Sequence, residues 1–135
     1  MLYKYRLLKN AIGIVIFINI ELLENVDILN TDLEICPDIY LRILGDIKYD
    51  RDKIKYWIGI GIKDLSDSIR RILNDSVVVF ELRQLDFDDA HFQEEALYCA
   101  VQGWISSYLN FPLSSIQIEF DEKKRRFNFN IPRRS

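Results

Sequence analysis

The chain has 135 residues, of which 49% are apolar and 13% aromatic, and its net charge at pH 7 is −3. This is the size of one ordinary domain with enough apolar material for a core, and the balance of charges argues against a disordered chain or a general nucleic-acid binder. Two cysteines, Cys36 and Cys99, are too few for a disulfide framework. We therefore expect a single domain over residues 1–135 in a reducing, cytoplasmic setting.

Basic residues precede the apolar run 11–18 (AIGIVIFI), an order also found in secretory signal peptides. The run has only eight residues, Asn19 and Glu21 follow it, and no small-residue cleavage pattern is present. It is also far too short to span a bilayer, so we expect no membrane partner. Its β-branched content favours strands, and we predict two of them, over residues 2–8 and 12–22, with the turn near Asn10.

The pattern weakens over residues 25–50. The stretch DLEIC indicates a strand that ends before Pro37, whereas IYLRILGDI (residues 39–47) is compatible with a strand or a short helix. Residues 51–73 are clearer, because isoleucines and leucines recur there at steps of three and four, and they predict an amphipathic helix. Gly59 and Gly61 inside it each cost about 1 kcal/mol relative to alanine, so we expect that they allow close packing against another backbone.

A strand is predicted over residues 77–87, followed by a helix over residues 90–109 that is apolar around most of its circumference. Such a helix is either central in the core or covered on its outer side by a partner. Residues 115–121 and 126–131 alternate and predict a hairpin that turns across residues 122–125. The predicted fold class is α+β, with a mixed or antiparallel sheet of five or six strands and two helices packed on one face.

The segment from Asp86 to Trp104 holds the only histidine and is the best candidate for chemistry. If the helix begins at Ala90, His91 and Glu95 share one helical face, as in some metal-binding helices. A catalytic zinc takes three protein ligands, and a second histidine is missing. These acids also have a structural explanation. Asp88 or Asp89 can cap the exposed N–H groups of the helix, and Glu94 and Glu95 would lie in its first turn, where the positive end of the helix dipole favours them. We therefore expect no metal, no cofactor and no catalytic residue.

Two further candidates have structural explanations. Cys99 would lie about 12 Å along the helix from His91, too far to share a proton with it, so we expect a small core residue. The basic run KKRR (residues 123–126) stands beside Phe127 and Phe129, as in some RNA-binding strands. In an acidic chain we favour a solvated turn for this run and expect no nucleic-acid partner.

Carboxylates cluster in two regions. Residues 21–50 contain eight against Arg42 and Lys48, and residues 81–95 contain six against Arg83. They are concentrated in loops and at the ends of elements, where they create a negative surface able to steer a basic partner, although ordinary solubility charge would look the same.

The stretch GIKDLSDSIRRIL, followed by SVVVFELRQLDFDDAHFQEEALYCAVQGW, is similar in layout to domain IV of the translational elongation factor G. In that domain a helix leads to a long strand, an acidic turn with a histidine, and an alanine-rich helix. The similarity covers residues 54–109 and implies a ribosomal-protein-type α+β fold. It brings no catalytic residue with it.

The length, the acidic patches and the helix EALYCAVQGW also resemble the small immunity proteins encoded beside bacterial polymorphic toxins. This resemblance implies a non-enzymatic inhibitor that occludes a cognate toxin domain, in many cases a basic nuclease. The residues nearest to such a role are Asp86, Asp88, Asp89, Glu94 and Glu95, with Asp27, Asp32, Glu34 and Asp38 as a second patch. Two alternatives stay open: a small acidic secretion chaperone, which predicts a stable homodimer and an extended client segment, and a hydrolase that uses His91 with Glu94 or Glu95.

Overall fold

A computed structural model describes residues 1–114 and 116–132 and confirms the α+β class. In chain order the elements are β1 (Leu2–Lys9), β2 (Ile12–Glu24), β3 (Leu33–Cys36), β4 (Ile39–Ile43), α1 (Arg51–Asp64), α2 (Ser66–Ile72), β5 (Val78–Phe87), α3 (Ala96–Leu109), β6 (Ile118–Asp121) and β7 (Arg126–Phe129). The undecided region 25–50 thus contains two strands. Among the described residues, five strands form one sheet, and β6 and β7 form a separate hairpin.

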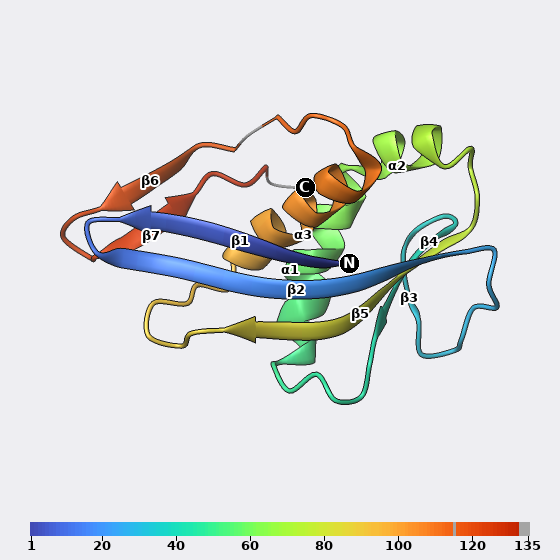
Figure 1. The fold of residues 1–135 in the computed structure, drawn as a ribbon, viewed down its shortest axis with the longest axis horizontal. Helices are drawn as coiled ribbons and strands as arrows, with labels where there is room; N and C mark the ends of the chain where they lie inside the picture. The colour runs from blue at the N-terminus through green and yellow to red at the C-terminus, as the bar shows by residue number, and fades with distance from the viewer. Residues whose placement is uncertain (115, 133–135) are drawn as a thin grey trace.

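The five-stranded sheet has the order β1-β2-β5-β4-β3 (Figure 1). Its first hairpin turns at Asn10 and Ala11, which both have positive φ angles of 50° and 64°, as a type I′ turn requires. The pair β4 and β5 is parallel, and α1 and α2 make the crossover between them. The pairs β1–β2, β2–β5 and β3–β4 are antiparallel.

One face of the sheet is buried by the helices. Alternate residues of β2, from Ile14 to Ile20, are at most 2% exposed, as the period of two in a strand predicts. Val78, Phe80 and Leu82 of β5 face the same side and belong to the same core. Figure 1 shows α1 and α3 together behind this face, and the β6–β7 hairpin adds the buried Phe127 to the core. The predicted placement of helices on one face is confirmed.

The predicted helix over residues 51–73 is two helices. α1 ends at Asp64, and the Leu65 N–H donates to the Ile62 carbonyl oxygen at 3.0 Å, which is a tight turn of the 3₁₀ type. α2 then begins at Ser66 and buries Ile69. The apolar spacing continues across the break because both helices bury the same side, so the periodicity gave no sign of it.

The prediction that the second helix begins at Ala90 was wrong. Residues 90–95 form turns, and α3 begins at Ala96, with Glu95 as an N-cap residue whose side chain makes no capping bond. The Asp88 carboxylate accepts the N–H of Ala90 at 2.9 Å, so it closes a local turn and caps no helix. Glu94 and Glu95 consequently precede the first turn of α3. The predicted end at Leu109 is confirmed, and Asn110 follows it in the left-handed region.

The C-terminal hairpin is shorter than predicted. β6 begins at Ile118, and β7 ends at Phe129, while the turn over residues 122–125 is confirmed. Residue 115, where the first strand was predicted to start, lies outside the described residues. The Asp121 carboxylate accepts the N–H groups of Lys123 and Lys124 at 3.0 and 3.1 Å, and the basic run is exposed, as expected for a solvated turn.

α3 is central in the core, which explains its apolar circumference. Nine of its residues between Ala96 and Ile105 are buried. It crosses α1 at Gly61, where an added Cβ would overlap Val101 and lie 3.2 Å from the Tyr98 carbonyl oxygen. The prediction of close backbone packing is confirmed for Gly61 and wrong for Gly59, whose Cβ would meet only the flexible side chain of Ile35 at 3.4 Å.

Candidate partner-binding surfaces

The carboxylates predicted after β5 do not form one acidic face. Asp86 lies on the outer face of the sheet, paired across from Phe17, and accepts a hydrogen bond from Gln84. Glu94 forms an ion pair of 3.1 Å with Lys53, and Glu95 forms one of 3.5 Å with Arg126. Asp88 and Asp89 remain exposed in the connecting loop. Glu94 and Glu95 are therefore neutralised by the protein's own cations.

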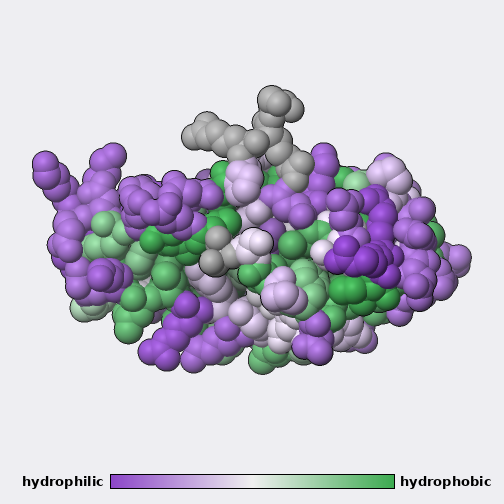
Figure 2. All heavy atoms as spheres, turned by 90° about the horizontal axis from the view of Figure 1, so that it is seen from above, coloured by the Kyte–Doolittle hydropathy of each residue, from purple (hydrophilic) through white to green (hydrophobic). Residues whose placement is uncertain are grey.

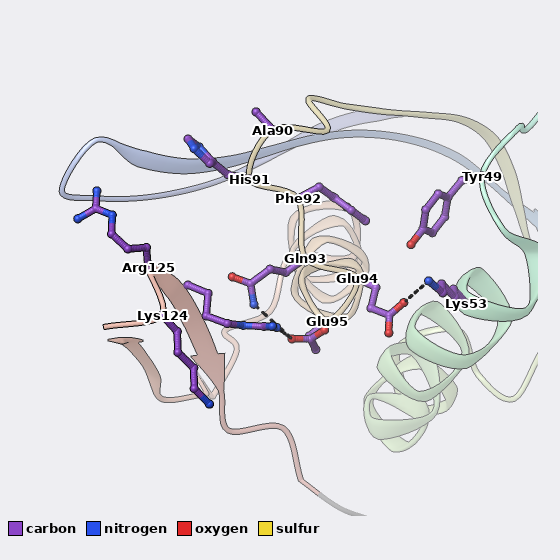
Figure 3. Close-up of a pocket in the computed structure, with 11 residues that line it drawn as sticks. Tyr49, Lys53, Ala90, His91, Phe92, Gln93, Glu94, Glu95, Lys124 and Arg125 are labelled. Carbon is purple, nitrogen blue, oxygen red and sulfur yellow. Dashed lines mark hydrogen bonds and ion pairs between the residues drawn. The ribbon is translucent and has the colours of Figure 1, made fainter. Parts of the chain in front are cut away.

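A hollow of about 530 Å³ lies between α1, residues 90–95, which precede α3, and the β6–β7 turn (Figure 3). Its charged lining is mostly basic and consists of Lys53, Lys124, Arg125 and Arg126 against Glu94 and Glu95, with His91 at the rim. The Lys53 ammonium is held by Glu94, and this hydrogen bond raises the lysine pKa. The hollow thus combines charges of both signs in the region where the sequence predicted an acidic patch.

The arrangement proposed for His91 depended on a helix that is absent there. Because residues 90–95 are turns, His91 and Glu95 do not share a helical face, and that expectation was wrong. Figure 3 shows the His91 side chain pointing away from Glu94 and Glu95. Within residues 1–114 and 116–132, no three histidine, cysteine, aspartate or glutamate side chains come together as a metal site.

Cys99 is half-buried on α3 and contacts Tyr5 of β1. Burial raises the pKa of its thiol to about 11, since the low-polarity surroundings disfavour the thiolate. At neutral pH the thiol is protonated and a poor nucleophile. This environment fits a packing residue, as expected from the sequence, although Cys99 is not completely shielded from solvent.

The second predicted patch lies on the loop that joins β2 to β3, called here the β2–β3 loop (residues 25–32). Asp32 is not one of its exposed acids, because its side chain has no solvent exposure and receives two hydrogen bonds of 2.8 Å from the Arg42 guanidinium. Asp32 also accepts the N–H of Leu29 at 2.8 Å. The hydrogen bond from Arg42 is the main reason that the pKa of Asp32 is lowered.

Arg42 fixes the whole loop from the outer face of β4. Its Nη2 atom also donates to the Asp27 carbonyl oxygen at 3.2 Å, and its Nη1 atom lies 3.5 Å from the Glu81 carboxylate. The loop must cross this face, because β5 and β4 separate β2 from β3 in the sheet. One arginine therefore makes hydrogen bonds near both ends of the loop.

The β2–β3 loop presents apolar side chains to solvent. Val26, Ile28 and Leu29 are 37%, 39% and 48% exposed, and the exposed Asp27 stands between them. Three exposed apolar side chains close together in one loop that is held by hydrogen bonds form a small apolar patch, a feature of many protein-binding surfaces.

Two of the other predicted acids adjoin this loop. The Val78 N–H donates to the Asp38 carbonyl oxygen, and the Asn25 N–H donates to the Val77 carbonyl oxygen. Because Val77 and Val78 are adjacent, these two bonds bring the start of the loop close to Asp38. Glu34 is exposed on the neighbouring β3 and accepts a hydrogen bond from Tyr40. Asp27, Glu34 and Asp38 are thus exposed on neighbouring segments, the β2–β3 loop, β3 and the β3–β4 turn, which lie at the right of Figure 1.

Sequence reasoning missed Val26, Ile28 and Leu29. The only available signal was three apolar residues within NVDILNTD, a stretch whose asparagines and aspartates favour a loop. Apolar residues in such a stretch have no strand or helix that could bury them.

No family model, curated protein or solved structure matches this chain. None of the described helices is long and apolar enough to cross a membrane.

Proposed function

We propose that this protein is a non-catalytic inhibitor of the immunity type, which binds a basic domain of a bacterial toxin and covers its functional surface. The observation that carries the proposal is the β2–β3 loop, which is hydrogen-bonded to Arg42 and displays Val26, Ile28 and Leu29 around Asp27. The proposed setting is the cytoplasm, and the proposed partner is the C-terminal toxin domain, for example a basic nuclease, encoded by a neighbouring gene.

The two kinds of side chain in the loop would contribute differently. Apolar side chains that become covered by the partner contribute through the surface that they remove from water. Exposed carboxylates speed the encounter with a basic partner and select against acidic ones. Because the contacts of Arg42 with Asp27 and Asp32 already order the loop, little conformational entropy remains to be lost on binding.

The experiment starts from the toxin domain of the neighbouring gene, expressed alone and together with this protein. We expect growth arrest from the domain alone, rescue by co-expression, and a stable complex in titration calorimetry. Leu29→Asp and Asp27→Lys should each weaken the complex at least tenfold and reduce rescue.

Matched controls separate the loop from the rest of the surface. Tyr56→Asp changes an exposed aromatic residue on α1, and Asp89→Lys reverses a charge after β5. Both should bind within twofold of the unchanged protein, with circular dichroism confirming the fold of every variant. Absence of binding refutes the inhibitor proposal, and loss of binding in Asp89→Lys alone places the interface after β5.

A further inference from the structure

The five-stranded sheet has one long free edge. β1 has eight residues and pairs only with β2 among the described strands. The opposite edge, β3, has four residues and an irregular register with β4. An exposed edge offers unpaired main-chain N–H and C=O groups to an incoming strand, and β1 is the edge long enough to hold one.

The register shows which residues of β1 offer these groups. Met1 and Ile20 exchange two main-chain hydrogen bonds, and Leu2 lies opposite Asn19. In an antiparallel pair, bonded and non-bonded positions alternate along the strand. The N–H and C=O groups of Leu2, Lys4, Arg6 and Leu8 therefore point away from β2, toward the free edge.

The side chains of these four residues also lie together on the outer face of the sheet. All are exposed, with Leu2 at 54% and Leu8 at 60%. They give the edge an apolar position at each end and two cations between. The Lys4 ammonium lies 5.6 Å from the centre of the Phe17 ring, and neither Lys4 nor Arg6 forms an ion pair with a described residue.

The inner side of the same edge is hollowed. Tyr3 and Tyr5 of β1 line an apolar hollow of about 180 Å³, together with Cys99 and Gln102 of α3 and Leu113 and Ile118, which follow α3. Figure 2 shows the molecule from above the view of Figure 1, and apolar areas lie between polar ones on that side. A strand added beside β1 would direct alternate side chains to this hollow.

A second copy of the chain fits this edge poorly. Antiparallel pairing of β1 with its own copy would set Lys4 and Arg6 of one chain against those of the other, and like charges directly opposite are destabilising. Carboxylates at the same positions would instead be attracted to both cations. Charge complementarity thus selects an extended segment of another protein that carries acids on one face.

We propose that the free edge of β1 binds an extended acidic segment of a partner protein as an added strand, with carboxylates beside Lys4 and Arg6 and apolar residues beside Leu2 and Leu8. This surface is separate from the β2–β3 loop, and the proposal does not depend on the proposed inhibition.

The test uses a synthetic peptide of eight residues with the sequence LTETETLT, in which threonine separates the leucines and glutamates. Binding is followed by fluorescence anisotropy, and hydrogen exchange of the β1 amides is followed by NMR on the full chain. We expect saturable binding that slows exchange of the outward amides of Lys4, Arg6 and Leu8 at least tenfold. A peptide of the same composition with adjacent glutamates should bind at least tenfold more weakly.

Variants of β1 separate main-chain pairing from simple charge attraction. Lys4→Glu combined with Arg6→Glu should lose binding at least tenfold and bind a peptide with lysines in place of the glutamates. Arg6→Pro removes one outward N–H but no bond to β2, so it should bind at least threefold more weakly than Arg6→Ala. Circular dichroism verifies that each variant is folded.

Three results would overturn the proposal. The first is equal binding of both peptides, and the second is binding that leaves exchange of the β1 amides unchanged. The third is a protein that is dimeric by light scattering, with these amides already protected before peptide is added, which would assign the edge to a second copy.

Discussion

Arg42 and Asp32 join β4 to the β2–β3 loop through two hydrogen bonds of 2.8 Å, one from Nε and one from Nη2. The pair is charge-assisted and planar, the geometry that arginine and carboxylate prefer. Asp32 is shielded from solvent, whereas the Arg42 side chain is 15% exposed. This ion pair is therefore one of the main contacts that tie the loop with the proposed anchors to the sheet.

We predict that Asp32→Asn destabilises the protein by about 2 kcal/mol at pH 7, the range measured for hydrogen bonds to charged groups. Because Arg42 lowers the pKa of Asp32 in the folded state, the stabilisation is present above the ordinary carboxyl pKa of 3.8 and is lost as pH falls below it. Urea unfolding measures this. The free energy of unfolding of Asp32→Asn should be much lower than that of the unchanged protein at pH 7 and only slightly lower at pH 3. Equal differences at both pH values would contradict this assignment.

The two buried glycines of α1 should respond oppositely to alanine. At Gly61 the new methyl group would collide with Val101 and press on the Tyr98 backbone, so we expect Gly61→Ala to lose about 2 kcal/mol, a typical cost of overpacking. At Gly59 it meets only Ile35 at 3.4 Å, and the gain in helix propensity of up to about 1 kcal/mol should leave Gly59→Ala neutral or more stable. Thermal unfolding of both variants side by side checks the prediction, which a stable Gly61→Ala would refute.

Gln93 holds the β6–β7 hairpin to the rest of the molecule. Its side-chain amide donates to the Phe127 carbonyl oxygen and accepts the Phe127 N–H, both at 2.8 Å, as a neighbouring strand would. We expect Gln93→Ala to lower stability by about 1–2 kcal/mol and to speed hydrogen exchange at Phe127. Gln117→Ala, which removes an exposed bond to Glu119, is the control and should change neither. Unaltered exchange at Phe127 in Gln93→Ala would show that Gln93 does not hold the hairpin.

Cys99 should resist alkylation in the folded protein. With its pKa raised to about 11, little thiolate is present at pH 8, and we expect iodoacetamide to label it at least tenfold more slowly than in urea. Because the folded pKa exceeds the ordinary value of 9.0, the stability that Cys99 contributes is complete below pH 9 and is lost as pH rises through 11. Mass spectrometry of tryptic peptides measures the labelling, and equal rates in both states would contradict the burial of the thiol.

The strands and the helix faces could be predicted because they repeat with a fixed period. Alternation in β2 and β5 and the spacing of Ile54, Ile58 and Ile62 gave the α+β class and the buried faces. The start of α3 could not be predicted this way. Its acids look like capping residues in the sequence, but Glu94 and Glu95 pair instead with Lys53 and Arg126 from distant elements.

The candidate surface was only partly predictable for the same reason. Asp27, Glu34 and Asp38 are exposed, as expected for the second acidic patch, whereas the Asp32 side chain is covered by Arg42, a residue ten positions away on β4. The local sequence pattern does not indicate which acid will form an ion pair with an arginine from another element.

The central place of β5 has a consequence for synthesis of the chain. β5 is the strand that joins the β1–β2 hairpin to the β3–β4 hairpin, so a nascent chain that stops before Val78 carries two disconnected hairpins with bare inner edges. Unpaired strand edges promote aggregation. The isoleucine-rich β2 makes this intermediate more prone to aggregate, because its apolar residues are not yet covered. Translation pauses upstream of residue 78 would thus be more damaging to yield than pauses after residue 87, where all five strands of the sheet have been synthesised.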